Sequence, residues 1–143
     1  MCSSVSDNLT FMIANSSITI SQRSQLPVIT HLIAAYKTWH EFVPNIPKDS
    51  RYTIGSKIDT LFLETVELVF TASYLGRGQK QPHLQKAAAR FDVLKFFLQI
   101  LWEIKALDNK KYVMLSEKLD EIGRMLGGWL RQVTGPARSQ PQR

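Results

Sequence analysis

Apolar residues recur along the chain at alternating steps of three and four, the spacing of one face of an α-helix. Four segments show this pattern, and turn-forming residues separate them. The stripes run from Ile29 to Val43, from Ile54 to Leu75, from Leu84 to Leu101 and from Tyr112 to Val133. The pattern predicts an all-α protein with four long amphipathic helices.

The connections between the stripes are short and rich in residues that end helices. Pro44 and Pro47 remove backbone donors after the first stripe, and Gly76 and Gly78 form a stop signal after the second. Short connections force consecutive helices to run in opposite directions. We therefore expect an up-down-up-down antiparallel four-helix bundle.

The 143 residues suit one domain, which we place at residues 26–134. Residues 1–25 are rich in Ser and Thr and keep no helical period, so we expect a flexible N-terminal extension. Gly135 and Pro136 break the last stripe, and residues 135–143 are expected to form a flexible, basic C-terminal tail.

The second and third predicted helices each carry an additional apolar stripe. Its residues are Phe62, Val66, Val69 and Phe70 in the second helix, and Val93, Phe97, Ile100, Ile104 and Leu107 in the third. One stripe is enough to face the core of a bundle, so the additional stripe would be exposed unless another subunit covers it. We favour a homo-oligomer with these residues, apart from Leu107, at its interface over a broad core face on long helices.

Basic residues outnumber acidic residues by eighteen to twelve, and some of them cluster. Between Gly76 and Phe91 the chain holds no acidic residue but contains Arg77, Lys80, His83, Lys86 and Arg90. This cluster is either a surface that contacts phosphates or a solvated helix start. Lys110 and Lys111 form a smaller basic pair at the next helix junction, which an antiparallel bundle places at its opposite end.

Catalytic and metal-binding patterns are not found in the sequence. The three histidines include no pair at a spacing of four, Cys2 is the single cysteine, and neither a phosphate-binding loop nor a nucleophile elbow is present. Every apolar run is too short to span a bilayer. We expect a cytoplasmic protein that is not an enzyme, with no metal, cofactor, membrane contact or small-molecule substrate.

The four stripes, the turn Pro44–Ser50 and the segment RYTIGSKID at Arg51–Asp59 resemble a known four-helix-bundle family over about residues 26–132. That family includes the intervening-sequence proteins of 23S ribosomal RNA genes. Those proteins typically carry paired arginines after the position of Ile58 and a later Asn-Ile-Ala-Glu-Gly stretch. Here Asp59 replaces an arginine, and Glu64–Ser73 reads ETVELVFTAS. The chain is therefore most similar to the accessory variability determinant (Avd) branch, from diversity-generating retroelements.

This resemblance implies a non-catalytic homopentamer, built as a barrel-like ring, that binds the element's reverse transcriptase and RNA or DNA. Its role would be to support the mutagenic cDNA synthesis that diversifies a target gene. We expect nucleic acid to contact Arg77, Lys80, Lys86, Arg90, Lys110 and Lys111. The alternative is a structural homo-oligomeric helical scaffold that binds protein partners only, in which the positive charge serves solubility.

Overall fold

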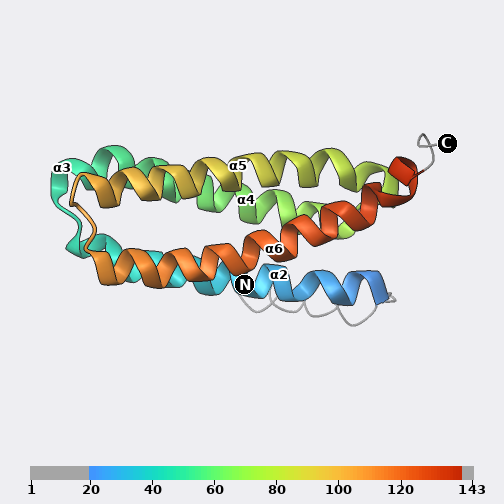
Figure 1. The fold of residues 1–143 in the computed structure, drawn as a ribbon, viewed down its shortest axis with the longest axis horizontal. Coiled ribbons are helices and arrows are strands. Elements are labelled where there is room, and N and C mark those ends of the chain that lie inside the picture. The colour runs from blue at the N-terminus through green and yellow to red at the C-terminus, as the bar shows by residue number, and fades with distance from the viewer. Residues whose placement is uncertain (1–19, 140–143) are drawn as a thin grey trace, which may run out of the picture.

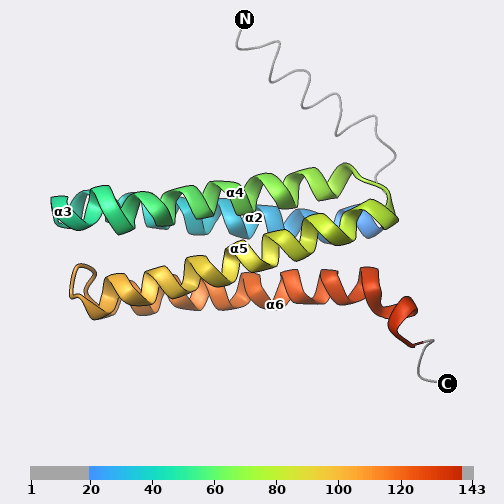
Figure 2. The ribbon, with the colours of Figure 1, turned by 90° about the horizontal axis from the view of Figure 1, so that it is seen from above.

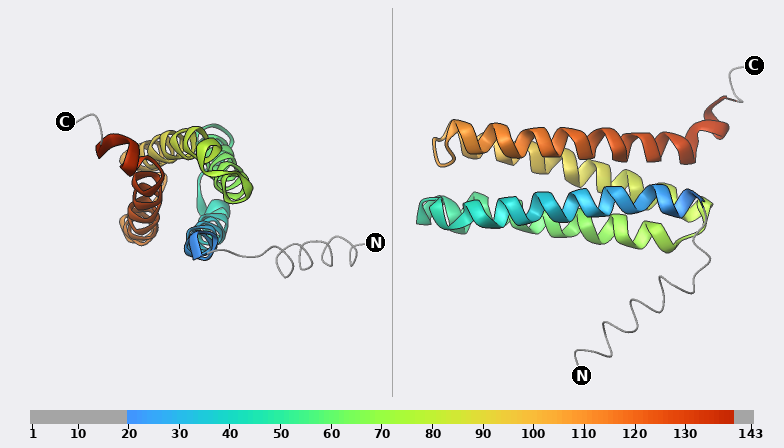
Figure 3. Two further views of the ribbon diagram at one scale, coloured as in Figure 1. Left: turned by 90° about the vertical axis from the view of Figure 1, so that its right-hand side faces the viewer. Right: turned by 90° about the horizontal axis from the view of Figure 1, so that it is seen from below.

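The computed structural model describes residues 20–139, with side chains from Pro27 to Thr134. This part of the chain forms four long helices and contains no strand. They are α2 (Ile20–Phe42), α4 (Ser56–Tyr74), α5 (Arg77–Glu103) and α6 (Asn109–Ser139). Each helix runs opposite to the one before it (Figure 1), and the end-on view in Figure 3 shows them in the order α2, α4, α5, α6 around the bundle. The predicted four-helix bundle is confirmed.

A compact turn joins α2 to α4. The chain passes through the 3-10 turn η1 (Val43–Asn45) and the short helix α3 (Lys48–Ser50), and then through the π-helical turn η2 (Arg51–Gly55) into α4. Arg51 stabilises this turn because its guanidinium donates hydrogen bonds to the carbonyls of Ile46, at 2.9 Å, and Pro44, at 3.0 Å. The helical run therefore begins at Lys48, well before the first apolar residue of the second stripe.

Both terminal helices extend beyond the predicted bundle of residues 26–134. Helix α2 begins at Ile20, six residues before Leu26, and α6 continues through Gly135 and Pro136 to Ser139. The apolar period marks only the part of a helix that is buried, so its loss did not mark the helix ends. Residues 1–19 and 140–143, the remainder of the two predicted flexible termini, lie outside the described residues.

The core contains residues from every stripe. Trp39 and Phe62 are fully buried and their rings stack with centroids 6.5 Å apart, while Phe91 lies against the same core. Asp59 joins α2 to α4, because it accepts hydrogen bonds from the Tyr36 hydroxyl at 2.9 Å and the Trp39 indole at 3.3 Å. Burial, the bond to Asp59 and the charge of Asp59 raise the pKa of Tyr36.

Candidate functional site

Three segments without acidic residues meet at one end of the bundle. The start of α2, the connection between α4 and α5 and the end of α6 lie together at the right-hand end of Figure 1 and Figure 2. Residues 20–33, 68–91 and 125–139 contain no Asp or Glu. We call these residues the basic end. Its exposed basic side chains, among those described, are Arg77, Lys86, Arg90 and Arg131.

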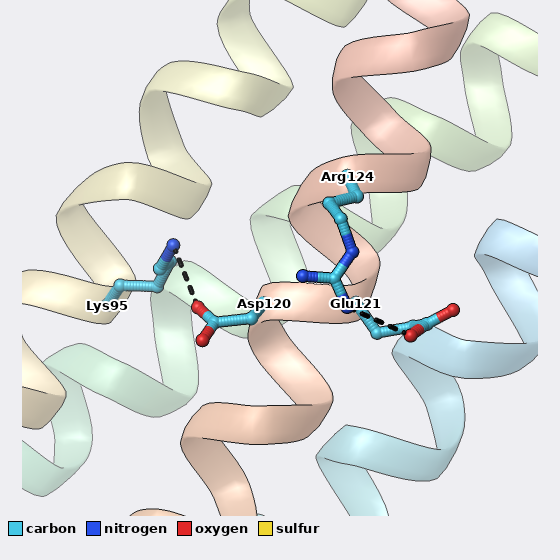
Figure 4. Close-up of polar contacts among 4 residues, drawn as sticks. All are labelled: Lys95, Asp120, Glu121 and Arg124. Carbon is cyan, nitrogen blue, oxygen red and sulfur yellow. Dashed lines mark hydrogen bonds and ion pairs between the residues drawn. The ribbon is translucent and has the colours of Figure 1, made fainter.

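Ion pairs between α5, α6 and α4 lie where the basic end meets the rest of the bundle. Lys95 of α5 pairs with Asp120 of α6 at 3.3 Å, and Arg124 pairs with Glu121 within α6 at 3.1 Å (Figure 4). Arg90 pairs with Glu64 of α4 at 3.0 Å. Arg90 is therefore partly neutralised, whereas two of the predicted contacts at this end, Arg77 and Lys86, are exposed with no ion pair among the described residues.

Arg77 links the start of α5 to the end of α6. Its guanidinium donates a hydrogen bond of 3.1 Å to the carbonyl of Gln132. In an α-helix this carbonyl would accept the N–H of residue 136, but Pro136 has no N–H to donate. Arg77 supplies the missing donor, which explains how α6 continues past the proline that was expected to end it.

Lys80 was expected to lie in an exposed basic cluster, and the structure corrects this placement. It is only 8% exposed, and its ammonium donates a hydrogen bond of 2.8 Å to the carbonyl of Ala72 near the end of α4. The ammonium nitrogen also lies 5.9 Å from the centre of the Trp129 ring. Burial lowers the pKa of this lysine. The cause of the error is that α5 begins at Arg77, so Lys80 belongs to the buried face of the helix.

The second predicted basic cluster lies at the opposite end, at the turn between α5 and α6 (Figure 1). Lys110 is exposed, whereas Lys111 donates hydrogen bonds to Asp108 through its backbone, at 2.8 Å, and its ammonium, at 2.9 Å. These bonds lower the pKa of Asp108. The turn also carries Lys105, in a left-handed backbone conformation with φ of 65°, and Glu103. Its charge is therefore mixed, unlike that of the basic end.

The predicted oligomer interface is divided by the structure between core and surface. Phe62 and Val69 are buried inside the single bundle, so they cannot form an outer face. The core stripe of α4 is wide enough to take in both Phe62 and Val69. Of the other predicted residues, Val66, Phe97 and Ile100 are half-buried, whereas Phe70, Val93 and Ile104 are exposed.

Among the described residues, large apolar side chains are exposed on all four long helices, Ile33 of α2 and Val113 and Met114 of α6 included, and we single out two faces, on α4 and α5. The first, which we call the α4 face, consists of Leu63, Phe70 and Tyr74. These three residues lie on the same side of α4 as Asp59, whose carboxylate contacts α2. Glu64 lies on the other side of α4 and pairs with Arg90 of α5.

The second exposed face, which we call the α5 face, consists of Val93, Phe96 and Ile104 along the outer side of α5. Phe96 is 57% exposed, the most of these side chains. The sequence analysis missed Leu63, Tyr74 and Phe96, although each lies three or four residues from an interface residue that it predicted.

Comparison with known proteins gives one match. A family model described as bAvd-like matches residues 20–133, which includes α2, α4 and α5 and most of α6. No curated protein and no solved structure matches the chain. Among the helices of residues 20–139, none is both long enough and apolar enough to cross a membrane.

Proposed function

Because the chain belongs to the bAvd-like family, the accessory variability determinants of diversity-generating retroelements, we propose that it is a non-catalytic oligomer that binds nucleic acid through its basic end. It acts in the cytoplasm together with the element's reverse transcriptase. There it supports the mutagenic cDNA synthesis that diversifies the target gene.

The absence of acidic residues from the basic end is the observation that carries this proposal. Residues 20–33, 68–91 and 125–139 contain no Asp or Glu, and the described basic side chains among them come from α5 and α6. Such a region has a positive potential, which attracts the phosphates of RNA or DNA. Lys86 and Arg131 are the contacts we expect first, because both are exposed and have no ion pair among the described residues.

The two exposed apolar faces support assembly into a ring. A ring of more than two subunits needs two different surfaces on each copy, since each subunit contacts its two neighbours through opposite sides. The α4 face and the α5 face are two such surfaces. We propose that the α4 face of one copy packs on the α5 face of the next, in a pentamer as the family resemblance implies.

The same faces give some support to the alternative function. Leu63, Phe70 and Phe96 could instead hold other proteins, and the chain would then be a scaffold that binds no nucleic acid. Salt dependence separates the two functions, because contacts with phosphates release counterions and weaken steeply as salt rises.

The test compares two triple variants that lose the same charge. Lys86→Gln, Arg90→Gln and Arg131→Gln alter the basic end, and Lys57→Gln, Lys105→Gln and Lys110→Gln alter the opposite end. Arg77 and Lys80 are left unchanged because they bond the carbonyls of other helices. Binding to single-stranded RNA and DNA is measured by fluorescence anisotropy over a series of salt concentrations.

We expect the basic-end variant to bind both nucleic acids more weakly. The plot of log affinity against log salt has a negative slope, and its magnitude should decrease by about 2 to 3. Each lost phosphate contact reduces that magnitude by roughly 0.7 to 0.9. The opposite-end variant should stay close to the parent. Binding that is absent or insensitive to salt in the parent itself would rule out this function and favour the protein-only scaffold.

A further inference from the structure

A pocket of about 320 Å³ opens at the basic end, between the start of α5 and the end of α6. It is lined by Arg77, Lys80, Trp129, Gln132 and Val133. Two of these side chains are cationic, and none of the five is acidic. The proposed function requires contacts with phosphates, and several hydrogen-bonding groups of these lining residues have donors without a partner.

Lys80 is the first such group. An ammonium has three N–H donors, and one hydrogen bond, to the carbonyl of Ala72, is found for this one. No carboxylate pairs with it among the described residues, although the side chain is 92% buried. A buried charge without a counter-ion is unfavourable, so a negative group entering the pocket would stabilise Lys80.

Trp129 is the second. It is 5% exposed, and its indole N–H is, within the described residues, the one buried side-chain nitrogen or oxygen without a hydrogen-bond partner. The indole N–H groups of the other two tryptophans do have partners: Trp39 donates to Asp59 and Trp102 donates to Asn109. Buried polar groups in folded proteins are nearly always paired, so an unpaired one calls for an explanation.

Arg77 adds further donors to the same pocket. One of its nitrogens donates to the carbonyl of Gln132, and a guanidinium has five N–H donors in all. The pocket thus combines two cations with an excess of donors. These side chains lack a negative partner and hydrogen-bond acceptors. A tetrahedral oxyanion supplies both, because it carries negative charge and several acceptor oxygens.

We infer that this pocket binds a phosphate group. This inference rests on the proposed function for the source of the phosphate, which would be the backbone of the bound nucleic acid. The phosphate would lie between Arg77 and Lys80, beside Trp129, and would fix one nucleotide of the strand at the basic end. Free phosphate has the same chemistry, so the experiment treats the two sources separately.

The experiment follows the three indole N–H resonances of the full-length protein in ¹H–¹⁵N spectra. Inorganic phosphate is added in one arm and a short single-stranded oligodeoxythymidine in the other, with chloride holding the ionic strength constant. The Trp129 resonance, identified by its loss in Trp129→Phe, should shift in both arms. Those of Trp39 and Trp102 should not move, because their indoles already have acceptors.

Single-residue variants test which side chains bind the phosphate. Lys80→Met keeps the length of the side chain and removes its charge, and it should weaken phosphate binding at least tenfold. Arg77→Gln is a second, independent removal of a pocket cation, should Lys80→Met fail to fold. Lys57→Met removes the same charge from an exposed lysine outside the pocket, at the opposite end of the bundle, and should change phosphate affinity less than twofold.

The outcomes separate this inference from the proposed function. A Trp129 resonance that moves with phosphate but not with oligonucleotide supports the pocket, assigns it free phosphate and counts against nucleic-acid binding. A resonance unmoved in both arms, in a protein that still binds oligonucleotide in a salt-dependent way, overturns the pocket and leaves the proposed function standing. Equal weakening by Lys57→Met and Lys80→Met would also overturn it.

Discussion

Arg77 and Lys80 show that the first basic residues of α5 act on the ends of other helices. Lys80 donates to the carbonyl of Ala72 at the end of α4, and Arg77 donates to the carbonyl of Gln132 in α6. Cations are unfavourable at the start of their own helix but favourable near the end of another, where carbonyls lack partners. The two side chains therefore help to hold the end of the bundle together.

The contact between Arg77 and Gln132 predicts that Arg77 and Pro136 are coupled. Arg77→Ala should lower the free energy of unfolding by about 1 kcal/mol, the usual contribution of such a hydrogen bond. Pro136→Ala restores a backbone N–H for the Gln132 carbonyl, so Arg77→Ala should cost less in that background. Urea unfolding of the two single variants and the double variant, at one protein concentration, measures the coupling.

Arg131→Ala is the matched control, because it removes an exposed arginine of α6 whose side chain has no hydrogen bond among the described residues. It should change the stability by a few tenths of a kcal/mol at most, and equally in both backgrounds. If the effects of Arg77→Ala and Pro136→Ala simply add, Arg77 does not replace the missing donor, and the continuation of α6 needs another explanation.

At the level of helices, the exposed faces predict how copies meet. Phe70→Asp on the α4 face and Phe96→Asp on the α5 face should each reduce assembly, because each buries a carboxylate in the interface. Both side chains are exposed in the single bundle, so each variant should stay helical. Mixing the two variants leaves one intact pair of faces and should give a dimer that grows no further.

Analytical ultracentrifugation of each variant and of the mixture tests this. Leu63→Asp serves as a second variant of the α4 face and should behave as Phe70→Asp does, while mixing these two should restore nothing. A mixture of Phe70→Asp and Phe96→Asp that stays monomeric would contradict the pairing of the α4 face with the α5 face.

The number, order and direction of the helices could be predicted from the sequence, because the stripes report which residues a helix buries. Their ends could not: α6 continues past Pro136, and the carbonyl that the proline leaves without its helical donor accepts a hydrogen bond from Arg77, 59 residues earlier. The additional stripes mixed core residues such as Phe62 with surface residues such as Phe70, since a spacing alone does not give the width of the buried face. Lys80 was expected to be exposed for the same reason, because the spacing did not show that it belongs to the buried face of α5.

At the scale of the whole molecule, the basic end is a product of the topology. The three acid-free segments are separated by more than thirty residues in the sequence, and each is unremarkable by itself. The antiparallel arrangement brings the start of α2, the turn after α4 and the end of α6 together (Figure 1). The sequence analysis identified only the middle segment, because the other two contain isolated arginines rather than a cluster.

The separation of charge along the bundle has a consequence for the thermodynamics of assembly. Copies related by rotation about an axis parallel to the helices all point the same way, so a ring would gather every basic end on one rim and the subunits would repel one another there. Nucleic acid bound to that rim offsets the repulsion. Linkage then requires that strand binding and subunit association strengthen each other by the same factor. In sedimentation at low salt and submicromolar protein, adding an oligonucleotide should convert dissociated subunits into rings, whereas an uncharged peptide nucleic acid should not.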